Sequence, residues 1–508
     1  MNENIKFTIE NQQCKQIDIE TSGDVVSKQI LKVIDLTYHL GIYNEGKNVL
    51  YCEETNTYID EDKTLNECGV YSGSIFRVVS KEKYDSLKLK NENNNSYPEF
   101  IRNTRIKTVL SQEKIIIKNP SPKPQKSTNS ILLSLLPIMV MLVITIVVRS
   151  FTKSNNIYII FTVCSMSIGI MTSFISYMQG QGKYNKAIKN RREGYERYIT
   201  DLKQKIIEAR KKEKEDLEQL YYSANQEYEL VCSFSSELFD RRPGDEDFLY
   251  VCVGNAVLPA KRQLEYRMTE KLEVTDVLEK IPSQLQTAYK YIKNVPLAFS
   301  LLECSAVGIV GKKDNRDYMF KRMLMDICTR QFSSDVKLYF FGTQEQEELA
   351  KNIRLLPHLQ NKEQAMRNIA IDKESRNNLM DYLLRRITEK EIEKVNVPID
   401  VIFVYDEGEI KQHPIAKYID CGKDVGVCFI FFQENMEVLP QGCDKIIEVT
   451  EEQGTLWDSR NKEERQSFYY EKISDEIIKE IAEKLAPVYA KEVNLNNLIP
   501  VSYTHLRA

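Results

Sequence analysis

The chain has 508 residues, of which 42% are hydrophobic, 28% charged and 9% aromatic, and its formal net charge is −4. This length suffices for about two to four domains. The near-neutral charge argues against a nucleic-acid-binding protein, which would carry a basic domain or stripe. The mean hydropathy of −0.41 is typical of a soluble protein. However, the average hides an uncharged stretch, because Arg149 and Lys153 are the only charged residues between Ser127 and Gly182.

The cysteine and histidine content argues against disulfides and metal sites. The eleven cysteines are scattered with no Cys-x-x-Cys pair, and the chain has four histidines. A disulfide framework needs regular pairing, and a zinc site needs clustered ligands. We therefore expect buried free thiols in a reducing compartment and no metal site.

Residues 1–80 predict a small α/β domain. Apolar residues alternate at Ile5, Phe7 and Ile9, which predicts the first strand of a hairpin. A second strand, a helix and three further strands are expected near 17–19, 25–40, 48–52, 57–59 and 74–79. This order, with its Thr-Leu-x-x-x-Gly-Val-x-x-Gly ending, resembles a ubiquitin-like β-grasp domain. A Gly-Gly ending is absent, so the resemblance implies a module that binds a partner through its sheet face.

Residues 81–130 are polar and contain alternating prolines, which predicts an extended linker. The next segment, 131–178, contains two uncharged runs, 131–148 and 157–178. Each run is long enough for a helix to cross a hydrocarbon core of about 30 Å. Lysines and arginines flank the pair on both sides, so the positive-inside rule predicts a transmembrane hairpin with both flanks in the cytoplasm. We therefore expect a multi-pass protein of the cell membrane.

Residues 183–225 predict a basic stalk helix. An apolar stripe at Tyr195, Ile199, Leu202 and Ile206 runs along it. The stripe suits either a coiled-coil seam or packing against the next domain. The basic start of this helix also suits anionic lipid head groups.

Residues 230–490 predict one α/β domain that ends in a helix. Short apolar strands alternate with helical stretches, which favours a mainly parallel sheet covered on both faces. The strands are expected at Phe248–Val253, Leu297–Leu302, Ala306–Val310, Val336–Phe341, Asp400–Tyr405, Gly426–Phe432 and Lys445–Val449.

The first site to test in such a domain is a phosphate loop. The nearest candidate contains Gly308, Gly311 and Lys312, but two residues separate its glycines where a P-loop has four. Lys313 stands where Ser or Thr is required, and Asp314 adds a negative charge. We therefore expect a degenerate site and no bound cofactor.

The strand ending at Tyr405 is followed by Asp406 and Glu407, in the outline of a Walker B motif. In working ATPases such acids hold magnesium and polarise water. Without a phosphate cradle, a turn or cap role is the competing interpretation. No nucleophile–base–acid set is evident, so we expect no catalytic residues.

A charged turn rich in Pro and Gly precedes the first strand of this domain. The segment 238–254 resembles the signature of the EssC/EccC family, the membrane-anchored FtsK/SpoIIIE-type ATPases of type VII secretion. The matching residues are Arg242, Pro243, Asp245, Asp247, Phe248, Leu249 and Gly254. Phe239 replaces the usual Trp, and Cys252 replaces the usual Arg. The order of the predicted domains also agrees with this family.

The resemblance implies a multidomain α/β membrane protein whose 230–490 region is a degenerate P-loop-ATPase-like domain. The family handles small helical secreted proteins through later ATPase domains, which would bind ATP and Mg²⁺ and form a homo-oligomeric ring with other secretion components. Firmicute members commonly begin with forkhead-associated domains, whereas this chain begins with a ubiquitin-like unit. We expect residues 491–508 to start a linker to missing domains and to end in a non-native tail.

The resemblance favours the N-terminal, regulatory part of a type VII secretion motor, with no ATP hydrolysis by this chain itself. Three alternatives stay open. The chain could be a stand-alone membrane scaffold or signalling protein that recruits partners through its β-grasp domain. It could also be an NTPase that acts through Asp406 and Glu407 with an unorthodox phosphate site. DNA translocation is the third alternative, but a basic groove is lacking.

Overall fold

The computed structural model describes residues 4–10, 16–40, 42, 48–52, 57–70, 72–80, 100–102, 109–125, 131–151, 156–267, 276–361, 367–406, 408–488 and 490–492. These residues form two compact units, each built from segments that are distant in the sequence. Unit 1 comprises 1–109, 216–258 and 293–508, and unit 2 comprises 110–215 and 259–292. Most of the predicted linker 81–130 and of the segment 491–508 lies outside the described residues.

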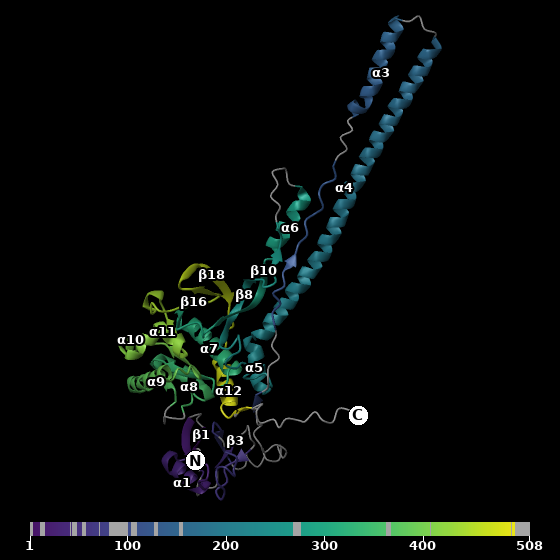
Figure 1. Cartoon of the computed structure of the whole chain (residues 1–508). Helices are drawn as coiled ribbons and strands as arrows, with labels where there is room; N and C mark the ends of the chain where they lie inside the picture. The colour runs from purple at the N-terminus through teal and green to yellow at the C-terminus, as the bar shows by residue number, and fades with distance from the viewer. Residues whose placement is uncertain are drawn as a thin grey trace, which may run out of the picture. The chain divides into compact units, whose positions relative to one another are not determined.

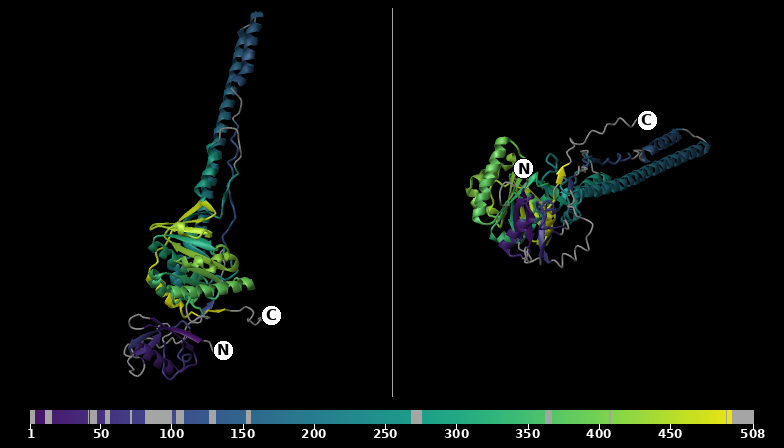
Figure 2. Two further views of the ribbon diagram at one scale, coloured as in Figure 1. Left: turned by 90° about the vertical axis from the view of Figure 1, so that its left-hand side faces the viewer. Right: turned by 90° about the horizontal axis from the view of Figure 1, so that it is seen from below.

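The N-terminal module of unit 1 is a five-stranded sheet with one helix, drawn in purple in Figures 1 and 2. Its elements are β1 (Asn4–Glu10), β2 (Gln16–Ser22), α1 (Ser27–Tyr38), β3 (Asn48–Cys52), β4 (Thr57–Tyr58) and β5 (Ile75–Ser80). The sheet order is β2-β1-β5-β3-β4, with β1 antiparallel to β2 and parallel to β5. Phe7, Ile9 and Leu31 lie in the core between sheet and helix. These elements lie where the sequence predicts them, and the assignment to the ubiquitin-like class stays a prediction.

The main sheet of unit 1 has ten strands in the order β10-β8-β18-β17-β16-β11-β15-β14-β12-β13. The strands are β8 (Tyr250–Pro259), β10 (Tyr291–Ser300), β11 (Ala306–Gly311), β12 (Val336–Phe341), β13 (Ile369–Ala370), β14 (Ile399–Val404), β15 (Val427–Gln433), β16 (Lys445–Val449), β17 (Gly454–Asp458) and β18 (Asn461–Tyr469). From β16 to β13 the pairing is parallel, as predicted, while β17 and β18 extend the sheet in antiparallel fashion.

Helices cover both faces of the parallel strands (Figure 1). One face packs against α5 (Ala224–Cys232), α7 (Lys313–Arg330), α8 (Glu347–Ile353) and α12 (Asp475–Leu485). The other face packs against α9 (Lys373–Glu393), α10 (Gly408–Gln412) and α11 (Tyr418–Cys421). Along β14 the side chains alternate between the two cores, with Phe403 in the first and Ile402 in the second. A strand buried on both faces explains why its sequence is continuously apolar.

Short 3₁₀ helices and a two-stranded sheet complete unit 1. The 3₁₀ helices are η1 (Gln344–Gln346), η2 (Pro357–Leu359), η3 (Pro414–Lys417), η4 (Gly422–Val425) and η5 (Met436–Val438). Strand β6 (Phe100–Arg102) pairs in parallel with β19 (Ala490–Glu492).

Unit 2 contains α3 (Ile131–Phe151), most of α4 (Asn156–Leu220), α6 (Val277–Ala288), and the parallel pair of β7 (Ile115–Ile116) and β9 (Leu264–Glu265). Figure 1 shows α4 as one continuous helix, so the second apolar run and the predicted stalk are a single element. The predicted apolar stripe of this helix, which includes Ile199 and Ile206, packs against Leu264 and Leu285. Of the two interpretations of the stripe, packing within the chain is therefore the one observed.

The predicted transmembrane hairpin, 131–148 and 157–178, is corrected by the structure. Among the helices of the described residues, none combines the length and the apolar character needed to cross a membrane. The fold class of a membrane protein and the multi-pass localisation, which both depended on this hairpin, are wrong on this finding.

Candidate functional site

The predicted phosphate-loop position lies at the carboxyl end of β11, in the middle of the parallel strands. Gly311 is the last residue of β11 and Lys313 is the first residue of α7, so Lys312 alone connects strand and helix. A phosphate loop needs several residues whose backbone N–H groups ring the phosphates. The structure therefore offers no room for a cradle between this strand and this helix.

Close packing explains the two glycines of this position. A Cβ atom on Gly308 would lie 2.5 Å from Cδ1 of Leu439, and one on Gly311 would collide with the carbonyl oxygen of Val449. Both Cβ atoms would lie much closer to these neighbours than ordinary van der Waals contact allows. The glycines thus allow neighbouring chain segments to pack closely. This packing explains why glycine stands at both positions without invoking a bound phosphate.

Carboxylates already face the basic residues at the start of α7. Lys312 Nζ lies 3.0 Å from Glu451 Oε1, Lys313 Nζ lies 3.5 Å from Glu345 Oε2, and Arg316 Nη2 lies 3.6 Å from Glu434 Oε1. The hydrogen bond from Lys312 also holds the pKa of Glu451 below its usual value. A nucleotide phosphate entering this edge would therefore meet negative charge at each of these cations.

The Walker B-like position is also engaged within the protein. Asp406 follows β14, which is separated from β11 by β15. Its Oδ2 accepts a hydrogen bond from Arg376 Nη1 at 3.1 Å, and its Oδ1 accepts one from the backbone N–H of Gly408 at 3.2 Å. These contacts are those of a turn residue, while Glu407 lies outside the described residues. The residues at this edge do not fit ATP with Mg²⁺.

The signature turn, residues 238–254, lies beside the C-terminal end of α4. Arg241 has 0% of its surface exposed, and its guanidinium donates to the carbonyl oxygens of Leu220 (2.8 Å) and Tyr250 (2.6 Å). The carbonyls of the last helical turn have no partner inside a helix. Arg241 therefore joins the end of α4 to the start of β8 by capping such a carbonyl.

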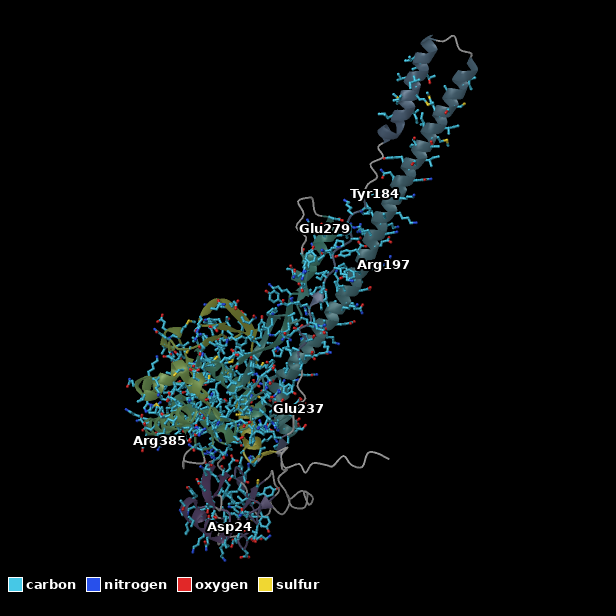
Figure 3. All side chains as sticks on the ribbon, viewed as in Figure 1. Asp24, Tyr184, Arg197, Glu237, Glu279 and Arg385 are labelled. Carbon is cyan, nitrogen blue, oxygen red and sulfur yellow. The ribbon has the colours of Figure 1, made fainter. Side chains whose placement is uncertain are left out.

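A second buried arginine joins the turn to the end of α7. Arg330 donates two hydrogen bonds to the carboxylate of Asp240, both 2.8 Å long, and stacks over the ring of Tyr222 at 4.1 Å. The hydroxyl of Tyr222 in turn donates to Glu237 at 2.7 Å, and Glu237 is labelled in Figure 3. The paired hydrogen bonds make this a planar, bidentate contact of the strong type.

The signature residues that the sequence singled out shape the turn itself. Asp245 closes it, because its Oδ2 accepts from the backbone N–H of Arg242 at 2.9 Å and its own N–H donates to the Arg242 carbonyl. Pro243 and Gly244 occupy the bend, and Gly244 has φ +94°.

The signature residues after the bend connect the turn to the first strand. Asp247 lies 3.5 Å from Arg241, and Phe248 and Leu249 are buried. Gly254 has φ +155°, and a Cβ there would collide with the carbonyl of Tyr469.

A buried set of one arginine and two acids lies next to this turn. Arg322 Nη1 lies 2.6 Å from Glu227 Oε2, and the N–H of Cys252 donates to Asp326 Oδ2 at 2.6 Å. Burial raises the pKa of Glu227 well above its usual value, and the proximity of Asp326 adds to this although Arg322 opposes it. Cys252 stands where the family signature has Arg, and Asp326 interacts electrostatically with Arg241 and Arg330 as well as with Arg322.

The sequence analysis missed the buried ionic residues Arg241, Asp240, Arg322, Asp326 and Arg330. A signal for the last three was present, because they recur at every fourth position of a helix that is otherwise apolar around Met323–Met325. Such spacing places them on one face. That face packs against α5 and the signature turn.

Comparisons with known proteins agree with the signature. No family model matches the sequence. The chain is 24% identical over 422 residues to the type VII secretion system protein EssC of Staphylococcus aureus strain NCTC 8325, covering 81% of this chain and 28% of the relative. It is 23% identical over 420 residues to the ESX secretion system protein EccC of Geobacillus thermodenitrificans, with the same two coverages. The predicted resemblance is therefore confirmed: homologues named EssC or EccC match over 81% of the chain.

The chain spans less than a third of the length of these curated relatives. Among solved structures, ATPases 2 and 3 of Thermomonospora curvata EccC, in complex with a signal sequence peptide, align with a TM-score of 0.35 at 10% identity. This alignment covers 51% of this chain and 52% of that one. EssC ATPases 2 and 3 from Geobacillus thermodenitrificans align with a TM-score of 0.33 at 8% identity, covering 49% and 50%.

We expect Asp240→Ala to lower the free energy of unfolding by about 3–5 kcal/mol, because it leaves the buried Arg330 without its counter-charge. The measurement is urea unfolding followed by the fluorescence of Trp457, which is the single tryptophan of the chain and is buried in β17. The matched control is Glu451→Ala, which removes the exposed partner of Lys312 and should leave the free energy of unfolding nearly unchanged. Equal costs for the two variants would contradict the structural role of the Asp240–Arg330 pair.

We expect Glu227→Gln to flatten the pH dependence of stability above the unfolded-state pKa of about 4.5. Since the folded-state pKa is raised, the folded state binds more protons, and the stabilisation present at low pH is lost as the pH rises. Glutamine keeps the acceptor for Arg322 and has no proton to lose. Unfolding curves at several pH values should therefore show an advantage of the variant that grows with pH. Glu229→Gln, on the exposed side of the same helix, should follow the unmodified chain.

Proposed function

We propose that this chain acts in type VII secretion as a part of an EssC-like motor that does not itself hydrolyse ATP. The observation that carries the secretion role is the similarity to EssC and EccC over 81% of the chain. The non-hydrolysing character is supported by the direct junction of β11 and α7 and by the carboxylates that face Lys312 and Lys313. ATP and Mg²⁺ then act in domains outside this sequence.

The role of the α/β domain in this proposal is mechanical. Arg241 fastens the carbonyl of Leu220, the last residue of α4, to the turn that begins the domain. Because the guanidinium is fully buried and bonded on two sides, a displacement of this helix end would break charge-assisted hydrogen bonds. The domain thus provides a rigid mount for the end of the long helix.

The partners follow from the same proposal. They are other components of the secretion system, further copies of the full-length protein in a ring, and small helical secreted proteins that are handled by domains outside this sequence. Nucleic acid is not among them, since the net charge of −4 shows no overall excess of basic residues.

We expect the purified chain to show no saturable binding of a fluorescent ATP analogue below about 1 mM, a dissociation constant that corresponds to about −4 kcal/mol, and no ATP turnover. Asp406→Asn should change neither result, because this carboxylate serves Arg376 and the turn at Gly408. Binding at micromolar concentration, lost on Asp406→Asn, would favour the NTPase alternative instead.

The secretion role is tested in the bacterium that encodes the chain. Export of small helical proteins should fall when Arg241→Ala is introduced into the gene, and should persist with Asp406→Asn. The protein level must be measured in parallel by immunoblot, so that loss of export is separated from loss of protein. Normal export after removal of the whole gene would overturn the proposal.

A further inference from the structure

Part of the outer face of the N-terminal sheet, around Thr8 and Glu10, is buried, although α1 packs only on the inner face. Along β1, Phe7 and Ile9 point into the core of the module, so Thr8 and Glu10 point to the opposite face. These two polar side chains are nevertheless only 2% and 6% exposed. A sheet with one free face would leave such residues in water, so another part of unit 1 must cover them.

The covering surface belongs to the α/β domain of the same unit. Ile75, which begins β5, is a member of the main hydrophobic core together with Ile481 and Leu485 of α12. Gly73, with φ +96°, brings the backbone so close that a Cβ atom would lie 2.6 Å from the carbonyl carbon of Ala486. The module therefore contacts the C-terminal end of α12 through both backbone and apolar side chain.

Two groups of charges flank this contact. Asp18 of β2 lies 3.1 Å from Arg367 Nη2 and 3.6 Å from Arg354 Nη2. Arg77 of β5 donates to Glu10 at 3.0 Å and to Glu483 of α12 at 3.1 Å. In the first group the module supplies the anion, and in the second it supplies the cation, so the pairs also fix the orientation of the module.

The charge state of Asp18 is coupled to the contact. Burial acts to raise its pKa, but Arg367 and then Arg354 outweigh burial, and the pKa of Asp18 lies below its usual value. The carboxylate is thus held ionised by groups that lie outside the module. Its hydrogen bond from Thr8 Oγ1, 2.8 Å long, ties this charge to the same outer face.

We propose that the outer face of the N-terminal sheet is an interaction surface whose partner is this chain's own surface of α12, Arg354 and Arg367. The Asp18 pairs and the Glu10–Arg77–Glu483 pairs hold the module there, and the module leaves this surface as one body when the pairs are broken. The inference goes beyond the secretion role and does not depend on it.

The test is carboxyl footprinting of the full chain, in which a carbodiimide couples glycine ethyl ester to accessible acids and mass spectrometry measures the rate at each. Glu10 is 6% exposed, whereas the side chain of Glu20 on the neighbouring strand is 43% exposed, so Glu20 is the internal reference. Asp18→Arg should raise the rate at Glu10 by about tenfold, which corresponds to about 1.4 kcal/mol of lost docking free energy. In the charge-exchange variant, Asp18→Arg is combined with Arg354→Asp and Arg367→Asp. This variant again places opposite charges across the contact, so the slow labelling rate at Glu10 should return.

A fold control separates undocking from unfolding. Cys52 is 0% exposed inside the module, so its thiol should stay unreactive in every variant that has only undocked. If Asp18→Arg makes Cys52 reactive, the milder Asp18→Asn is measured instead, and it should raise the rate at Glu10 with Cys52 still protected. The proposal is overturned if Glu10 reacts as fast as Glu20 in the unmodified chain, if the charge exchange fails to restore protection, or if Asp18→Asn leaves the rate at Glu10 unchanged.

Discussion

The pairing of buried arginines with carbonyls and carboxylates is the constraint on which the α/β domain depends. Arg241 connects the end of α4 with the start of β8, and Arg330 connects the end of α7 with Asp240 in the turn between them. A buried charge without its partner costs several kcal/mol, so these elements cannot shift independently. The signature turn is therefore the point at which three distant segments become one structure. The residue types in this turn are explained by charge pairing and by the bend of the backbone, and a catalytic role is not needed to explain them.

The same domain has a parallel sheet in which strands alternate with helices, but the junction of β11 and α7 lacks the geometry of a phosphate site. The reason is local: β11 passes into α7 through Lys312 alone, and its glycines make room for Leu439 and Val449. The positive end of the α7 dipole and its lysines would attract phosphate. Instead, Glu345 of η1 pairs with Lys313, and Glu451 pairs with Lys312. The surface charges at this edge thus balance within the protein.

Regular patterns made much of the fold predictable. The apolar strands at 306–310, 336–341 and 400–405 follow from side-chain period, and the structure has strands at all three places. The antiparallel strands β17 and β18 were not predicted. Strand β18 is mostly polar and most of its described side chains are exposed, so its sequence carries no apolar strand pattern. The transmembrane assignment rested on the length of the two apolar runs and on the basic residues that flank them. The ionic contacts of Arg241 and Arg330 could not be derived, since their partners lie far away in the sequence and only the folded chain brings them together.

The buried part of the outer face of the N-terminal sheet bears on the choice between a motor component and a stand-alone scaffold. A scaffold that recruits a partner through this face must first expose Thr8, Glu10 and Ile75, which the chain itself covers. A competing partner would have to present cations to Asp18 and an acid to Arg77, as Arg367 and Glu483 do. Recruitment through this face would therefore be conditional on release. A module that is bound to its own α/β domain in the resting chain suits an internal regulatory part better than a permanently open adaptor.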